Sequence, residues 1–235
     1  SQRQQICIKE YCLKYEYLVF DLDGTISDPK DGIVRSINYA LSAHDFATQD
    51  EDALSTFIGP PLESTFKVLT KSDEPKLISS LISKYRERYS DVGFSENLLY
   101  DDIPEVLEQL SSIPNVKLGI CTSKRADFAE RILDLFELRH HFSFVNGGEI
   151  GTEKWQQLSA LLQQGLINQK SVMIGDRYVD ITAAQKNSLD SAGVLWGYGS
   201  HNELAQLEPL YLFTTPRELV KLTSPQDHQT SEVGS

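Results

Sequence analysis

The stretch Val19-Phe20-Asp21-Leu22-Asp23-Gly24-Thr25 ends an apolar run that begins at Tyr17. The run Tyr17–Phe20 has the length of a strand and does not alternate clearly between apolar and polar residues, as expected of a strand buried on both faces of a parallel sheet. In such sheets ligands bind at the carboxyl ends of the strands. Asp21 and Asp23 therefore either carry chemistry there or form a turn in which Asp and Gly are favoured for backbone reasons.

Further apolar runs of strand length follow along the chain: Val116–Cys121, Phe142–Asn146, Ser171–Ile174, Ala192–Trp196 and a weaker run at Tyr211–Thr214. Between the later runs, apolar residues recur at helical spacing in segments 103–110, 128–136 and 158–162. This alternation of strands and helices predicts an α/β fold with a doubly wound, Rossmann-like parallel sheet.

Residues 29–98 break this alternation, because they contain no good strand run and several helical patterns. The apolar residues of these patterns are Ile33, Ile37 and Leu41, then Leu62, Phe66 and Leu69, then Leu77, Leu81 and Tyr85. We therefore expect a helical cap at 29–98, inserted into a catalytic core formed by 15–28 and 99–222. The polar segment 223–235 has no aromatic residue and is predicted to be a disordered tail.

Composition excludes several classes of function. The 235 residues include 22 Lys and Arg against 34 Asp and Glu, a net charge of −12, which disfavours binding to nucleic acid or to an anionic membrane surface. No apolar stretch approaches the ~20 residues that span a bilayer, no secretory signal is visible, and the three cysteines match no common zinc pattern. We expect a cytoplasmic monomer or homodimer that acts on a small metabolite.

Hydroxyl and acidic residues also follow the later strands. Thr122 follows the second run, where its hydroxyl could bind a phosphate oxygen or cap the helix that starts near Ala126. Asp176 and Asp180 follow the fourth run, where they could ligate a hard cation or only stabilise the start of a helix. Each residue taken alone leaves both interpretations open.

Lys154 begins a helix after the third run, at a place where most lysines are simply solvated. The set of residues changes the interpretation. Acidic, hydroxyl, lysine and acidic groups follow successive strands of one predicted sheet, an order that independent capping residues would rarely produce. The four positions together predict one site at the edge of the sheet.

These motifs together resemble the haloacid dehalogenase (HAD) superfamily. Asp21-Leu22-Asp23-Gly24-Thr25 is similar to its first motif, Thr122 to the second, Lys154 to the third and Gly175-Asp176-Arg177-Tyr178-Val179-Asp180 to the fourth. The resemblance covers roughly residues 15–222, and the helical insert resembles the type 1 cap of phosphoglycolate phosphatases and their relatives.

Finer segments resemble the branch called 5′-nucleotidase-like: Ile58-Gly59-Pro60-Pro61-Leu62, Tyr85-Arg86-Glu87-Arg88-Tyr89 and Gly197-Tyr198-Gly199-Ser200. Trp155 is a departure, because phosphoglycolate phosphatases usually carry proline after the motif lysine. We therefore favour a nucleoside 5′-monophosphate as the substrate over 2-phosphoglycolate.

The resemblance implies a Mg²⁺-dependent phosphomonoesterase. Asp21 would be the nucleophile that forms an aspartyl-phosphate, and Asp23 would be the general acid and base. Thr122 would orient a phosphate oxygen, while Lys154 would balance the charge of phosphate and nucleophile. The implied Mg²⁺ ligands are Asp21, the Asp23 backbone carbonyl and Asp176, with Asp180 holding metal-bound waters or Lys154. The residues expected to contact the substrate phosphate are Gly24, Thr25 and Ser123.

The cap would select the leaving group, and the segment around Pro60 and Pro61 is the expected specificity loop. Its prolines are equally consistent with a stiff loop followed by a helix that starts at Pro61. Four further cap residues could contact the substrate: Arg35, Asn38, Tyr39 and Arg88.

Residue types distinguish several rival functions on this scaffold. Asp23 argues against a haloacid dehalogenase, because those enzymes lack an acidic residue at this position. A phosphonoacetaldehyde hydrolase uses a lysine of the cap. Lys67 and Lys71 are present in the cap, but no other feature of the sequence points to that role. Three functions stay open beside a nucleotidase: a 2-phosphoglycolate phosphatase, a phosphosugar mutase with the same first motif and cap type, and a non-catalytic phosphate-binding module.

Overall fold

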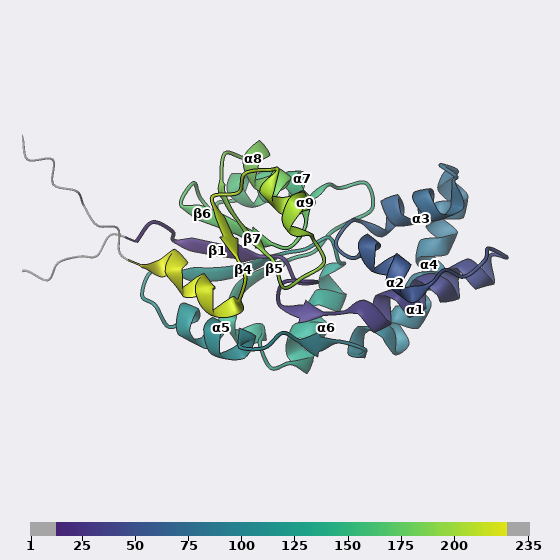
Figure 1. Cartoon of the computed structure of the whole chain (residues 1–235), viewed down its shortest axis with the longest axis horizontal. Coiled ribbons are helices and arrows are strands. Elements are labelled where there is room, and N and C mark those ends of the chain that lie inside the picture. The colour runs from purple at the N-terminus through teal and green to yellow at the C-terminus, as the bar shows by residue number, and fades with distance from the viewer. Residues whose placement is uncertain (1–12, 225–235) are drawn as a thin grey trace, which may run out of the picture.

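A six-stranded parallel sheet lies at the centre of the protein, for which the computed structural model describes residues 13–224 (Figure 1). Its strand order is β5-β4-β1-β6-β7-β8. The strands are β1 (Tyr17–Phe20), β4 (Lys117–Cys121), β5 (Phe142–Asn146), β6 (Ser171–Gly175), β7 (Asp190–Val194) and β8 (Tyr211–Phe213). Every neighbouring pair is parallel, which confirms the predicted doubly wound α/β sheet.

Helices cover both faces of this sheet. Leu18 and Phe20 pack with α5 (Ile103–Ser111) and α6 (Ala126–Leu135) on one face. Val19 packs with α7 (Lys154–Gln163) and α8 (Tyr178–Lys186) on the other. Because both faces of β1 are covered, its sequence is a continuous apolar run. The remaining core helices are α9 (His201–Ala205) and the 3-10 helices η3 (Arg139–His141) and η4 (Pro216–Thr223).

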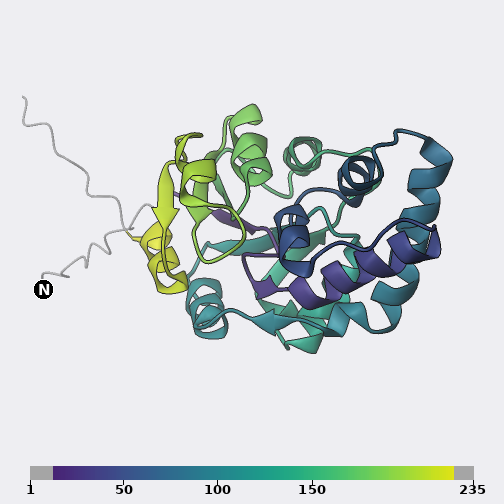
Figure 2. The same cartoon turned by 45° about the vertical axis from the view of Figure 1, so that its right-hand side comes forward.

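Four helices and a 3-10 turn form a separate cluster, here called the cap. They are α1 (Lys30–Ala43), α2 (Glu51–Leu54), η1 (Ser55–Phe57), α3 (Leu62–Thr70) and α4 (Pro75–Asp91). The expected apolar residues Ile33, Ile37 and Leu41 are buried in its core, which also takes in Phe128 of α6. Figures 1 and 2 show the cap at one end of the sheet, away from both ends of the described chain.

Two short strands at the base of the cap were not expected from the sequence. β2 (Ser27–Asp28) pairs antiparallel with β3 (Leu98–Leu99), next to the 3-10 helix η2 (Gly93–Ser95). Two residues are too few to produce a recognisable strand pattern. β7 also begins two residues before the expected run at Ala192 and ends at Val194, because Trp196 belongs to the loop that follows, where its Nε1 donates to the Thr25 carbonyl at 3.0 Å.

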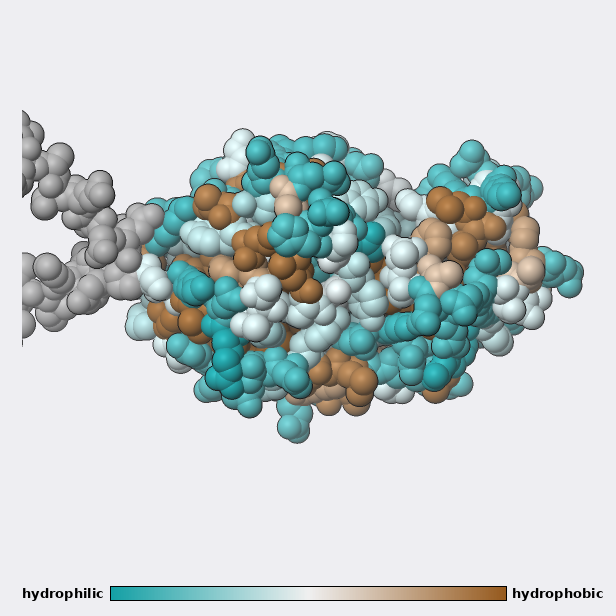
Figure 3. All heavy atoms as spheres, viewed as in Figure 1, coloured by the Kyte–Doolittle hydropathy of each residue, from teal (hydrophilic) through white to brown (hydrophobic). Residues whose placement is uncertain are grey.

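The predicted tail 223–235 lies outside the described residues from 225 onward, and Thr223 itself ends η4. On the face shown in Figure 3, hydrophilic residues separate several small apolar groups. None of the helices within residues 13–224 is long and apolar enough to cross a membrane.

Candidate active site

The expected site residues meet at the carboxyl edge of the sheet. Asp21 directly follows β1, Thr122 follows β4 and Asp176 follows β6, and these three strands are neighbours. Lys154 is the first residue of α7, whose start is fixed by a capping box between Glu153 and Gln156. All four expected side chains are buried. The parallel arrangement therefore brings together groups that lie up to 155 residues apart in the sequence.

Lys154 joins two of the acidic residues. Its Nζ lies 2.9 Å from Oδ2 of Asp21 and 2.5 Å from Oδ1 of Asp180. Burial by itself lowers the pKa of Lys154, but the charges of Asp180 and Asp21 outweigh it and raise this pKa above its usual value. The second oxygen of Asp180 accepts the backbone N–H of Arg177 at 3.0 Å. Asp180 therefore orients Lys154 with one oxygen and the start of α8 with the other.

Asp21, Asp176 and Asp180 form a compact acidic group whose ligand oxygens lie within 4.8 Å of one another. Burial, together with the charges of Asp180 and Asp21, raises the pKa of Asp176 well above its usual value. Oδ1 of Asp176 is buried without a hydrogen-bond partner in the described chain. Carboxylates this close stay ionised together only beside a compensating cation. An all-oxygen donor set fits a hard divalent ion such as Mg²⁺.

The loop after β7 encloses Asp176. The backbone N–H of Tyr198 donates to Oδ2 of Asp176 at 2.7 Å, and a Cβ at Gly197 would lie 2.4 Å from that oxygen. Gly24 approaches from the opposite segment with φ of 79°, and a Cβ there would lie 2.1 Å from the same atom. Glycine is needed at position 24 because Asp176 fills the space, whereas the sequence had suggested only a close approach to the phosphate.

Asp23 contacts a lysine that was not expected at the site. Oδ2 of Asp23 lies 3.1 Å from Nζ of Lys124, which also donates to Oη of Tyr89 in the cap at 2.7 Å. Burial raises the pKa of Asp23, although the charge of Lys124 acts in the opposite direction. The only signal in the sequence was the position of Lys124, two residues after Thr122.

A cavity of about 70 Å³ separates this edge of the sheet from the cap. Its wall includes Asp21, Asp23, Thr122 and Ser123 from the core, and the expected specificity residues Pro60 and Pro61 from the cap. Gly24 and Thr25 are not part of the wall, and Oγ1 of Thr25 is buried without a hydrogen-bond partner in residues 13–224. The aromatic residues of the wall are Phe57, Tyr85, Tyr89 and Phe128.

The other four cap candidates do not line this cavity. Arg35 and Arg88 both pair with Glu96, at 2.6 and 2.8 Å. Asn38 hydrogen-bonds the backbone of Gln49, and Tyr39 donates to Glu87 at 2.6 Å. These side chains hold parts of the cap together, so their polar groups are used within the cap itself.

Two arginines do line the cavity, and neither was expected. Arg125 is neutralised by Asp127, with two contacts of 2.5 Å. Arg86 of α4 has no ion-pair partner among residues 13–224, and burial together with the charge of Arg125 lowers its pKa below the usual value. Arg86 therefore places at the wall of the cavity a positive charge that no described acidic side chain neutralises in an ion pair.

Arg177, next to Asp176, connects the core to the cap. Its Nη1 donates to the carbonyl oxygens of Thr56 and Ile58, at 2.9 and 2.5 Å, and its Nε pairs with Glu203 at 2.8 Å. The side chain is buried.

Trp155, the departure noted in the sequence, lines a second cavity of about 220 Å³ beside Lys154.

Comparison with known proteins agrees with this geometry. The family described as haloacid dehalogenase-like hydrolase matches residues 18–194, and the chain belongs to that family. A 5′-nucleotidase from Pseudomonas aeruginosa is 36% identical over 208 residues, which is 87% of this chain and 93% of that protein. A phosphoglycolate phosphatase from Colwellia psychrerythraea is 29% identical, in a match that covers 87% of this chain and 95% of that protein.

A solved structure, described as a predicted phosphatase from Clostridium acetobutylicum, superimposes with a TM-score of 0.84 at 34% identity. The match covers 89% of this chain and 98% of that one. The protein is therefore a phosphatase of the haloacid dehalogenase-like family.

Proposed function

We propose that the protein is a Mg²⁺-dependent phosphomonoesterase that hydrolyses a nucleoside 5′-monophosphate through an aspartyl-phosphate. The observation that carries this proposal is the contact of Lys154 with Asp21, beside Oδ1 of Asp176, which has no hydrogen-bond partner in the described part of the chain. A buried nucleophile with a fixed positive partner and an oxygen-lined cation site is the combination that attack on a phosphate dianion requires. We expect a cytoplasmic monomer or homodimer.

In the first step, a carboxylate oxygen of Asp21 attacks phosphorus, and the bond from phosphorus to the leaving oxygen breaks. Asp23 gives its proton to that oxygen, a role helped by the burial that raises its pKa. In the second step, Asp23 takes a proton from water as the water attacks phosphorus, which releases phosphate and restores Asp21. Mg²⁺ held by Asp21, Asp176 and the Asp23 carbonyl would supply the positive charge that offsets repulsion between carboxylate and phosphate.

The surrounding residues position the phosphate in this proposal. Thr122 and Ser123 would donate hydroxyl hydrogen bonds to its oxygens, and Lys154 would balance charge on both the phosphate and Asp21. Asp180, whose two oxygens hold Lys154 and the Arg177 N–H, would keep the lysine in place. Gly24 and Thr25 would act through the backbone and the shape of the loop, since neither lines the cavity.

Aromatic residues support a nucleoside as the leaving group. Phe57, Tyr85 and Phe128 line the cavity beside Asp23, the proposed acid, and aromatic faces bind planar bases well. The present cavity of about 70 Å³ holds on the order of five water molecules. A nucleotide therefore requires the cap to move away before it binds.

A second candidate substrate is 2-phosphoglycolate, and Arg86 is the observation that favours it. A guanidinium at the cavity wall with no ion-pair partner among residues 13–224 suits a leaving group that carries a carboxylate. A nucleoside has no such charge, so the two substrates make different demands on Arg86.

Phosphate release from a panel of phosphorylated metabolites tests the proposal, with Arg86→Met run beside wild type. For a nucleotidase we expect the highest kcat/KM with a nucleoside 5′-monophosphate and a small effect of Arg86→Met. For 2-phosphoglycolate we expect Arg86→Met to raise KM tenfold or more. Arg217→Met, an exposed arginine paired with Asp102 outside the cavity, is the matched control.

The same panel distinguishes a phosphatase from a mutase and from a binding module. A phosphosugar mutase would isomerise a sugar phosphate without net release of phosphate, and a non-catalytic binding module would release none from any substrate. Absence of phosphate release from the whole panel, in the presence of Mg²⁺, would contradict the proposed function.

A further inference from the structure

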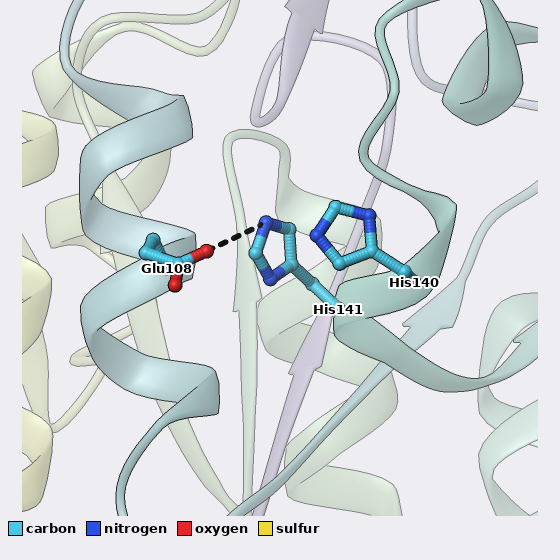
Figure 4. Close-up of side chains that lie close together, drawn as sticks. All are labelled: Glu108, His140 and His141. Carbon is cyan, nitrogen blue, oxygen red and sulfur yellow. Dashed lines mark ion pairs between the residues drawn. The ribbon is translucent and has the colours of Figure 1, made fainter.

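A second cluster of potential ligands lies at the amino ends of the strands, on the opposite side of the sheet from Asp21, which follows the carboxyl end of β1. Glu108 belongs to α5, while His140 and His141 form the end of η3, directly before β5 (Figure 4). Because α5 leads into β4 and η3 leads into β5, the cluster lies at the amino ends of the strands. It is therefore separate from the residues of the proposed phosphatase reaction.

The geometry of the three side chains suits a transition metal. One ligand atom from each residue lies within 4.8 Å of the others, and Nε2 of His141 is 3.7 Å from Oε2 of Glu108. Two ligands of a tetrahedral Zn²⁺, each about 2.0–2.2 Å from the metal, lie about 3.4 Å apart. Figure 4 shows a nitrogen of His140 on the side that faces His141. Small side-chain rotations would bring all three atoms to bonding distance.

Ser111 orients His141. Its hydroxyl donates to the backbone carbonyl of Glu108 at 3.3 Å, and its oxygen lies 2.9 Å from Nδ1 of His141. With the Ser111 oxygen accepting a hydrogen from Nδ1, Nε2 is the ring nitrogen left to bind a metal, 3.7 Å from Oε2 of Glu108. A hydrogen bond to the other ring nitrogen is also what holds metal-ligating histidines in orientation.

We propose that Glu108, His140 and His141 bind a divalent transition metal of the Zn²⁺ class. Two imidazoles and one carboxylate, completed by water, are a donor set that suits Zn²⁺ and disfavours Mg²⁺, which requires oxygen ligands. The metal would join α5 to the turn before β5, which is the edge strand of the sheet. Its role is to stabilise this edge of the core, and phosphate hydrolysis does not require it.

Titration calorimetry of the tag-free full-length protein with Zn²⁺, in excess Mg²⁺, tests this proposal. We expect about one equivalent of Zn²⁺ to bind with micromolar or better affinity. Glu108→Gln and His140→Ala should each weaken binding at least tenfold. Both side chains are exposed, so these variants should fold normally. His201→Ala, an exposed histidine on α9, is the control and should bind like wild type.

Thermal unfolding supplies an independent measurement. Zn²⁺ at about a hundred times its Kd should raise the Tm of wild type by about 5–10 °C and have little effect on Glu108→Gln. All of these proteins contain the same three cysteines, so binding by thiols cannot produce the difference. No binding below about 100 μM, or equal binding by wild type and both ligand variants, would overturn the proposal.

Discussion

Gly59 of the cap packs directly against Arg177 of the core, so closely that a Cβ at Gly59 would lie 2.7 Å from Cγ of Arg177. Gly59 has a φ of 110°, which side chains other than glycine rarely adopt. The guanidinium of Arg177 reaches past it to the carbonyls of Thr56 and Ile58. The residue that follows Asp176 therefore anchors the segment that carries Pro60 and Pro61.

Loss of this anchor should affect substrates according to their contact with the cap. Arg177→Met keeps most of the side-chain stem and removes the hydrogen bonds, so we expect kcat/KM for the best metabolite to fall about 10–100-fold, because cap closure is less favourable. Hydrolysis of p-nitrophenyl phosphate, slower in wild type because it lacks remote binding energy, should fall much less. Steady-state kinetics with both substrates measures this, with Arg217→Met as control. An equal loss on both would contradict a role through the cap.

Asp21→Asn should retain the fold and abolish turnover, because an amide cannot form the acyl-phosphate. We expect kcat to fall more than a hundredfold, a barrier increase above about 3 kcal/mol. Circular dichroism establishes folding, and phosphate release measures the rate. Retention of more than about a hundredth of wild-type kcat would exclude Asp21 as the nucleophile.

Activity should disappear with a chelator and return with Mg²⁺. Ca²⁺ accepts longer and more irregular coordination, so we expect it to bind and inhibit. A Mg²⁺ titration of phosphate release measures both effects, and full activity in the chelator would contradict the proposed cation site.

The two acids after β6 should differ in this titration. Asp176→Ala removes an expected ligand and should shift Mg²⁺ activation to much higher concentration. Asp180→Ala should cost less, about 10–100-fold in activity, because its oxygens hold Lys154 and the Arg177 N–H. Equal Mg²⁺ requirements in Asp176→Ala and wild type would remove Asp176 from the ligand set.

Glu96 should stabilise the cap in a pH-dependent way. Burial alone raises the pKa of Glu96, but hydrogen bonds from Arg88 and Arg35 outweigh it and hold this pKa below its usual value. The contribution is therefore present above the unfolded-state pKa of about 4.3 and is lost as pH falls through the lower folded-state pKa. Glu96→Gln should cost about 1–2 kcal/mol of unfolding free energy at pH 7.

Urea unfolding of wild type and Glu96→Gln at pH 7 and near pH 3 measures this difference. The gap between the two proteins should shrink at the lower pH, where Glu96 is protonated in the unfolded chain and increasingly in the folded one. A gap that stays constant or widens on acidification would show that the ion pairs with Arg88 and Arg35 do not stabilise the cap.

The sequence alone was sufficient for the sheet, the helical insert and the residues at the strand ends. Helices cover both faces of β1, so Tyr17–Phe20 is apolar on both faces, and this continuous apolar run is what predicts a buried strand of a parallel sheet. The strand pattern also predicts that Asp21, Thr122 and Asp176 meet, because each follows a strand and neighbouring parallel strands have their carboxyl ends on the same side of the sheet. The antiparallel pair β2–β3 was missed because two-residue strands have no pattern of their own.

The contacts between cap and core depend on tertiary packing. Lys124 hydrogen-bonds Tyr89, and Arg177 hydrogen-bonds the carbonyl of Ile58. Arg86 lines the cavity without an ion-pair partner in residues 13–224. Arg35 and Arg88 instead form ion pairs with Glu96. An arginine on a helix has the same sequence signature whether it faces substrate, a carboxylate or solvent. The role of each arginine depends on which segment packs against it. For Arg177 that segment includes Thr56, which is 121 residues away in the sequence. Such contacts join segments that are far apart in the sequence, so local periodicity does not predict them.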